Sequence, residues 1–280
     1  MAPVQVTKYS GETEEYDESK LRRSLRSAGA EQSIIDDIAK SVRDELHEGI
    51  STQKIYKEAF RQLRAKSQKI AGRYKLKEAL FELGPTGFPF EKFVSELLNR
   101  HGYETQTGVI VKGDCVNHEV DVIAHKDEEY LLVECKFHNR KENRCNVKVP
   151  LYIQSRFLDV KKNWTSQPGH KNKTHKGWVV TNTRFTSDAE IYGKCIGLKL
   201  LSWDYPKDEG IKDLIGRMNL HPVTCLSSLN KQEKSQLLDK NIIFCKQIFD
   251  DKGVLKKADI NPRKINTIYK EAVEICNHNH

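Results

Sequence analysis

Two apolar segments in the middle of the chain carry charged residues inside them, and this limits how they can fold. Glu119–Ala124 and Tyr130–Phe137 both have the composition of strands, and the short polar turn between them predicts a hairpin. Successive side chains of a strand point to opposite faces, so Glu134 and Lys136 share one face. If the two strands pair, Asp121 lies beside Glu134 at one end of the hairpin. The sequence therefore predicts two carboxylates and one ammonium group in a single cluster.

Such a cluster has a clear chemical use. Two carboxylates bind a hard cation such as Mg²⁺, or Mn²⁺ in its place, and the cation activates a water for attack on a phosphodiester. A lysine beside them adds positive charge where negative charge develops. The alternative is a salt bridge on a solvated strand face. The apolar neighbours of these residues, such as Val120, Val122 and Leu132, favour the cation site.

The surrounding residues, 86–205, predict an α/β domain. Helices and strands alternate there in the order helix, three strands, helix, strand, helix, strand, which is typical of a mixed sheet with helices on both faces. The expected helices are 90–100, 150–162 and 187–195, and the expected strands are 104–111, 119–124, 130–137, 177–181 and 198–203.

Positive charge is concentrated directly after the predicted strand that ends near Lys136. Between Lys136 and Lys176 there are eleven Lys or Arg residues against two acids, a local net charge of +9 in a chain whose total is +8. Such a stretch neutralises phosphates, although a solvated lysine-rich loop is the plainer alternative. The predicted DNA contacts are Arg140, Lys141, Arg144, Lys148, Arg156, Lys161 and Lys162.

This middle segment resembles the PD-(D/E)XK nuclease superfamily, and within it the Mrr-like restriction endonucleases. The resemblance rests on Phe90-Glu91-x-Phe93, Gly102-Tyr103, Asp121, Glu134-Cys135-Lys136, Tyr152-x-Gln154-Ser155-Arg156-Phe157, Val179-Val180-Thr181-Asn182 and Leu201–Pro206. It implies that Asp121, Glu134 and the carbonyl of Cys135 bind the metal and that Lys136 is catalytic, with Glu91 and Gln154 as accessory residues of the site. Asn117-His118-Glu119 replaces the glycine-rich segment common before the metal aspartate, which leaves the roles of His118 and Glu119 open.

Residues 1–85 predict a short hairpin followed by helices, and they resemble an ATP-cone, a regulatory nucleotide-binding domain. The matching residues are Val6-x-Lys8-x-x-Gly11, Glu14, Tyr16-Asp17-x-x-Lys20-Leu21 and Ser51-Thr52-x-x-Ile55-Tyr56. The resemblance implies that ATP or dATP binds to Val6, Lys8, Gly11, Glu14, Asp17, Lys20, Leu21, Thr52 and Tyr56. Lysines can hold triphosphate oxygens as point charges. A helix bundle without a ligand is the alternative.

Residues 206–280 predict a small helical region of unknown role, with helices near 207–218, 228–238 and 262–276. Residues 226–243 have the rhythm of a helix–hairpin–helix module, but the usual glycine turn is missing. Packing or oligomerisation is at least as good an explanation there as DNA binding.

Composition narrows the cellular setting. Seven scattered cysteines without a C-x-x-C pair indicate reduced thiols, and no apolar run has the length of a membrane span, so we expect a cytoplasmic protein.

The parts together predict a nucleotide-regulated, Mg²⁺-dependent DNA endonuclease. The resemblances imply a homo-oligomer and a role in bacterial restriction or defence. Three alternatives stay open: a nucleotide-responsive DNA-binding protein without cleavage, a ribonuclease or structure-specific nuclease that uses the same site, and a regulator of a partner enzyme.

Overall fold

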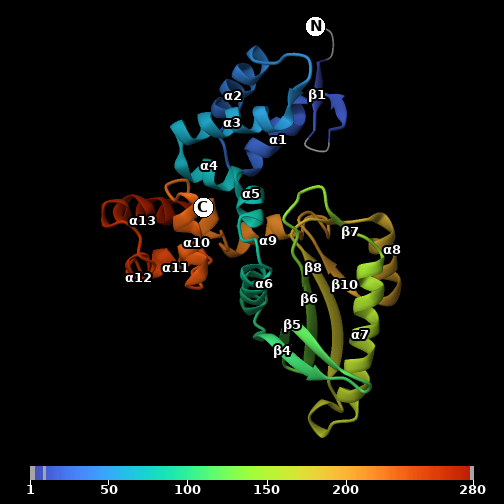
Figure 1. Ribbon diagram of the computed structural model, residues 1–280. Coiled ribbons are helices and arrows are strands. Elements are labelled where there is room, and N and C mark those ends of the chain that lie inside the picture. The colour runs from blue at the N-terminus through green and yellow to red at the C-terminus, as the bar shows by residue number, and fades with distance from the viewer. Residues whose placement is uncertain (1–3, 9–10, 278–280) are drawn as a thin grey trace. The chain divides into compact units, whose positions relative to one another are not determined.

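The computed structural model describes residues 4–8 and 11–277, which form two compact units (Figure 1). One unit combines the described residues up to Ala79 with those from His221 onward, and the other spans Leu80–Leu220. The described helices include none that is both long enough and apolar enough to cross a membrane.

The N-terminal part of the first unit is a small sheet followed by helices. β1 (Gln5–Thr7) pairs antiparallel with β2 (Thr13–Glu15) and parallel with β3 (Ile50–Ser51). The turn of the predicted hairpin lies partly outside the described residues. The helices are α1 (Glu18–Ser27), α2 (Gln32–Asp44), α3 (Thr52–Lys66), α4 (Gln68–Tyr74) and α5 (Leu76–Phe81).

Local capping and a shared core explain these elements. The side chains of Asp17, Ser51 and Ser67 accept hydrogen bonds from backbone N–H groups at the starts of α1, α3 and α4. The helical segment from Gln68 to Phe81 is interrupted at Lys75, which separates α4 from α5. The break lets α4 pack against the C-terminal helices, so tertiary packing overrides local periodicity here.

The C-terminal part of the same unit is helical. It contains a 3-10 turn (Val223–Cys225), α10 (Lys231–Asp239), α11 (Cys245–Asp250), α12 (Val254–Lys257) and α13 (Pro262–Cys276). The carboxylate of Glu271, fully buried, accepts hydrogen bonds from the N–H groups of Ser227 and Ser228 at 2.6 and 2.9 Å. Asn241 adopts a left-handed φ of 58° at the end of the turn after α10, which explains how this turn forms without glycine.

The second unit is built on a mixed five-stranded sheet with the order β10-β8-β6-β5-β4. β4 (Glu104–Lys112), β5 (Asn117–Lys126) and β6 (Glu129–Lys136) are antiparallel neighbours, and β6, β8 (Thr174–Thr181) and β10 (Lys199–Leu201) are parallel. Two further short strands, β7 (Arg144–Cys145) and β9 (Arg184–Phe185), pair with each other.

Helices cover both faces of this sheet, as the sequence predicts. α6 (Phe88–Arg100) lies on one face, and α7 (Lys148–Thr165) and α8 (Ser187–Ile196) lie on the other (Figure 1). Buried side chains of α7, including Phe157 and Val160, pack against Val120 and Leu132 of the sheet. The last helix of the unit, α9 (Ile211–Met218), contacts α6.

Candidate active site in the nuclease-like unit

The strands β5 and β6 separate where the predicted carboxylates lie. Their pairing runs from Lys126 and Glu129 to Val122 and Val133, and the register continues no further, whereas β5 stays paired with β4 down to Asn117. The backbone N–H of Cys135 therefore has no ladder partner on β5 and donates instead to Asp121 Oδ2 at 2.6 Å. This separation places the Asp121 carboxylate at the ends of the two strands, against the backbone of β6.

At the same place, the β4–β5 ribbon twists so that side chains before and after Gly108 lie on opposite faces of the sheet. Thr107 accepts a hydrogen bond from Lys92 of α6, while Val109 and Val111 pack with the core under α7, on the opposite face of the sheet. Gly108 lies between these two parts with a φ of 63°, a backbone conformation that glycine adopts without strain. The register places Gly108 opposite Asp121, so the aspartate lies at the point where the ribbon turns over.

Asp121 sits among other acids. Burial and the negative charge of Glu134, followed by that of Glu91, raise its pKa to about 6. Burial, Glu119 and Glu134 likewise raise the pKa of Glu91, which lies in the first turn of α6. Crowded carboxylates of this kind repel one another unless a cation lies between them.

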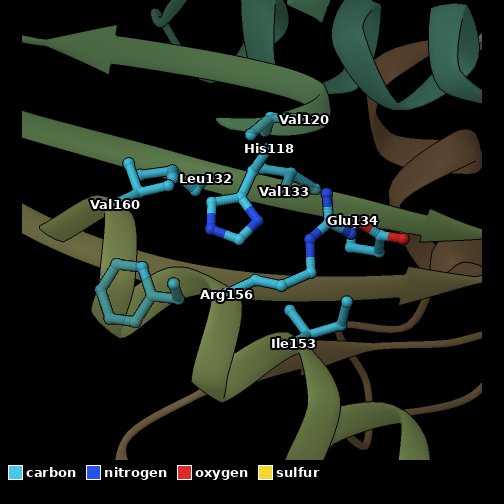
Figure 2. Close-up of a pocket in the computed structure, with 9 residues that line it drawn as sticks. His118, Val120, Leu132, Val133, Glu134, Ile153, Arg156 and Val160 are labelled. Atoms are coloured by element: carbon cyan, nitrogen blue, oxygen red, sulfur yellow. Dashed lines mark hydrogen bonds and ion pairs between the residues drawn. The ribbon is translucent and has the colours of Figure 1, made fainter. Parts of the chain in front are cut away.

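Glu134 is held by two cations. Its carboxylate contacts Lys136 Nζ at 2.5 Å and Arg156 Nη1 of α7 at 2.7 Å. Arg156 Nη2 donates to the carbonyl of Glu119. Figure 2 shows Arg156 extending from α7 toward Glu134. The sequence groups Arg156 with the DNA-contacting cations, but the structure places it inside the carboxylate cluster.

The residues present fit a hard divalent cation. Four carboxylates (Glu91, Glu119, Asp121 and Glu134) face three cations (Lys92, Lys136 and Arg156), so the cluster keeps a net negative charge. Carboxylate oxygens are the ligands that Mg²⁺ prefers. The repulsion that raises the carboxyl pKa values would be relieved by such an ion.

A small pocket beside Glu134 contains a residue whose role the sequence leaves open. The pocket has a volume of about 20 Å³, which is room for about one water, and His118 lines it with Arg156 and the apolar residues of α7 (Figure 2). His118 Nε2 lies 2.7 Å from Asp159 Oδ2, and the same carboxylate accepts the N–H of Cys115. Asp159 thus fixes the β4–β5 turn and His118 to α7, which no spacing in the sequence indicates.

The other predicted contacts divide into two groups. Arg140, Arg144 and Lys148 are exposed on the loop after Lys136, on β7 and at the start of α7, respectively. The loop is anchored by Asn182, whose side chain bonds both the N–H and the carbonyl of His138. Lys141 is also exposed on the loop and lies over the Phe81 ring.

Farther along α7, Lys162 pairs with Asp114 at 2.5 Å and Lys161 lies over the Phe157 ring. Gln154 is half-buried on α7, and no hydrogen bond among the described residues joins it to the carboxylates.

The first unit contains a pocket of about 200 Å³ that gathers most of the predicted nucleotide contacts. Its lining residues are Val6, Glu14, Tyr16, Asp17, Lys20, Leu21, Ser24, Thr52, Ile55, Tyr56 and Tyr74. Lys8 and Gly11 do not line it, but Lys8 Nζ lies 2.9 Å from Glu14 Oε2, and Lys20 Nζ contacts the same oxygen at 3.1 Å. The two lysines are therefore brought together as predicted, around a carboxylate.

Three aromatic residues give the pocket a wall suited to a base. Tyr56 and Tyr74 are stacked with ring centres 5.0 Å apart. Burial raises the pKa of Tyr16 to about 12, and its hydroxyl oxygen has no hydrogen-bond partner among the described residues. A lining lysine, aromatic rings and an unsatisfied hydroxyl fit a phosphorylated, ring-containing ligand. The contribution of Tyr74 could not be read from the short motifs, because it comes from a later helix.

Comparison with known families identifies the same two parts of the chain. Residues 4–77 match the ATP cone domain, and residues 85–205 match the restriction endonuclease family of the Mrr catalytic type. Residues 221–276 match the family described as AF1548-like, C-terminal. The chain thus has a nucleotide-binding type of domain followed by a nuclease type of domain.

An uncharacterized protein of Archaeoglobus fulgidus is 36% identical over 183 residues, which cover 65% of this chain and 99% of that protein. A crystal structure described as the protein of unknown function AF1548 matches with a TM-score of 0.57 and 33% identity, over 68% of this chain and 98% of that one. The chain therefore belongs to the AF1548-like family, and it carries an ATP cone ahead of its restriction endonuclease domain.

Proposed function

We propose that the chain is a divalent-cation-dependent endonuclease that hydrolyses DNA phosphodiester bonds under the control of ATP or dATP. The observation that carries this proposal is the cluster of Asp121, Glu134 and Lys136 at the separating ends of β5 and β6. The seven cysteines are free thiols, which fits action in a reducing compartment such as the cytoplasm. Restriction or defence is the role that we infer from the family.

Each residue of the cluster has a proposed task. Asp121 and Glu134, with the carbonyl of Cys135, hold the cation, which when bound polarises the phosphodiester and makes a water more acidic. Lys136 orients the attacking water and donates to the phosphate oxygen as negative charge grows. Arg156 keeps the Glu134 carboxylate oriented from the α7 side.

The remaining predicted residues act around this cluster. Glu91 and Gln154 complete its polar lining. The exposed lysines and arginines between residues 140 and 148 bind backbone phosphates on either side of the cleaved bond.

Plasmid cleavage tests the nuclease site. We expect nicking or linearisation of supercoiled DNA by the wild type with Mg²⁺, and a loss of about 100-fold or more in Lys136→Ala and Asp121→Asn, because each removes a group that acts on the transition state. Lys112→Ala and Asp188→Asn are matched controls, since both residues are exposed and lie outside the cluster. Cleavage that Lys136→Ala leaves unchanged would contradict the proposed site.

The choice of substrate is measured in the same assay. Duplex DNA, single-stranded DNA and RNA of one sequence are compared, and we expect duplex DNA to be cut fastest. Faster cleavage of RNA would make the protein a ribonuclease, and salt-dependent binding without cleavage would make it a DNA-binding protein.

Calorimetric titration tests the nucleotide site. We expect ATP or dATP to bind the wild type and binding to fall by about 100-fold in the double variant Lys8→Ala with Lys20→Ala, since two phosphate-binding charges are lost. Lys40→Ala with Lys57→Ala is the control, because these lysines are exposed on α2 and α3 and do not line the pocket. Equal ATP affinity in the two double variants would show that Lys8 and Lys20 do not bind the phosphates. Sedimentation of the same samples measures whether nucleotide shifts a homo-oligomer.

A further inference from the structure

One short helix connects the nucleotide pocket with the C-terminal helices. α4 has seven residues, and its last three contact three different parts of the unit. Tyr74 lines the pocket. Arg73 Nη1 comes within 3.5 Å of the position that a Cβ would take on Gly29, just after α1. Gly72 faces the C-terminal residues 221–276.

A side chain at Gly72 would displace Ile275. A Cβ at this position would lie 2.7 Å from Cδ1 and 3.3 Å from Cγ1 of Ile275, and 3.7 Å from the carbonyl oxygen of Cys225. Ile275 is fully buried on α13. The backbone of α4 therefore lies directly against α13, and Gly72 is the residue that permits this approach.

A second set of contacts joins the nucleotide pocket to the C-terminal residues 221–276. Tyr56, the other aromatic ring of the pocket wall, stacks on Tyr74. The 3-10 turn of the C-terminal part lies near this wall, because the carbonyl oxygen of Cys225 is 3.7 Å from the position that a Cβ would take on Gly72, two residues before Tyr74. Beyond α4, the hydroxyl of Thr224 donates to the carbonyl of Ala79 at 2.6 Å, and both residues are fully buried.

Because of these contacts, α4 must move as one body, so Tyr74 and Gly72 cannot shift independently. Closely packed interiors transmit displacement rather than absorb it. A shift of Tyr74 that accommodates a base must move Gly72, two residues away, against Ile275. Any ligand that favours one position of Tyr74 therefore also favours one packing of α4 on α13.

We propose that residues 221–276 are the part of the molecule that senses nucleotide occupancy, with Gly72 and Ile275 as positioning residues for Tyr74. The proposal rests on the proposed nucleotide site and gives a role to the AF1548-like C-terminal segment. Coupling between two sites is reciprocal, so a change at the α4–α13 contact must alter nucleotide affinity by the factor by which nucleotide alters that contact.

A compensating pair of substitutions in the full chain tests this. Gly72→Ala introduces the Cβ that meets Ile275 Cδ1, and we expect ATP to bind about five- to tenfold more weakly. Ile275→Val removes that Cδ1 atom, so the double variant Gly72→Ala with Ile275→Val should recover most of the affinity. Gly216→Ala is the matched control, since this helical glycine lies in the other unit with nothing within 4 Å of its added Cβ.

Hydrogen exchange on the wild type gives the reciprocal measurement. We expect ATP to slow amide exchange in residues 262–276 and 223–228, and the Lys8→Ala with Lys20→Ala variant to lose this effect. A structural role alone would change stability in Gly72→Ala without giving ATP-dependent protection at α13.

The possible failures are separable. ATP that binds the wild type and Gly72→Ala equally, without protection of α13, would overturn the coupling and leave the nucleotide site standing. If ATP, dATP and their Mg²⁺ complexes all fail to bind the wild type, the nucleotide assignment falls and the coupling falls with it.

Discussion

A single carboxylate contacts both Lys20, which lines the nucleotide pocket, and Lys8. Glu14 lies 2.9 Å from Lys8 Nζ and 3.1 Å from Lys20 Nζ, and these two contacts lower the pKa of Glu14. Its position on β2 is the one that a phosphate group of a bound nucleotide would use to reach the same lysines. If nucleotide binds as proposed, Glu14 competes with it for the lysines, and a triphosphate, which carries more charge than a monophosphate, would displace Glu14 best.

Replacing Glu14 should strengthen nucleotide binding. We expect Glu14→Gln to bind ATP about three- to tenfold more tightly, with a smaller gain for AMP, because partly exposed ion pairs of this kind are worth up to about 1 kcal/mol each. Glu15→Gln is the control, since Glu15 is the next residue of β2 and is exposed. Titration calorimetry measures both. Weaker ATP binding in Glu14→Gln would mean that this carboxylate contacts the ligand or its cation directly.

At the scale of elements, β6, α7 and β8 meet in a cluster of aromatic and histidine rings. Trp164 of α7 stacks on His170, with ring centres 4.6 Å apart, and His170 Nδ1 lies 3.1 Å from His175 Nε2. Burial, together with the positive charges of His170 and Lys161, lowers the pKa of His175 to about 4. Folding therefore requires His175 to be neutral.

The contribution of His175 to the stability of the nuclease-like unit should therefore fall in mild acid. Unfolded His175 takes up its proton near pH 6.5 and the folded residue only near pH 4, so the free energy of unfolding decreases as pH falls through this window, by about 1–2 kcal/mol. Asp121 titrates in the same range with the opposite sign, because its folded pKa is raised. The useful quantity is thus the difference between wild type and His175→Phe, which should lose this part of the pH dependence.

Urea unfolding followed by tryptophan fluorescence measures this difference. Trp164, Trp178 and Trp203 are the three tryptophans of the chain, and all lie in the 80–220 unit, so the signal reports that unit alone. Parallel pH curves for the wild type and His175→Phe would show that His175 titrates normally in the folded unit.

Elements with a clear periodicity could be predicted from the sequence, and elements defined by distant contacts could not. The β5–β6 hairpin and the meeting of Asp121, Glu134 and Lys136 follow from alternation alone, because the period of a strand fixes its faces. The helices α11 and α12 are not predicted, because six and four residues are too few to show a helical periodicity. From the sequence, Arg156 is interpreted as one more surface cation, because its partner Glu134 is 22 residues away in the chain.

At the scale of the whole molecule, the nuclease-like unit is inserted in the sequence between the two halves of the nucleotide-pocket unit. The sequence predicts three consecutive regions, because composition changes near residues 85 and 206 and carries no sign that the outer regions pack together. That packing depends on single atoms, such as the hydroxyl of Thr224 on the carbonyl of Ala79 and the missing Cβ of Gly72. Neither has a signature in hydrophobic periodicity.

This interleaved order has a consequence for biosynthesis. Domains fold as units while the chain emerges from the ribosome, and residues 80–220 are complete before α13 has been translated. The carboxylate cluster can therefore assemble on a nascent chain while α4 still lacks Ile275, its packing partner. Each newly made molecule thus acquires its carboxylate cluster first and the helices proposed to respond to nucleotide last.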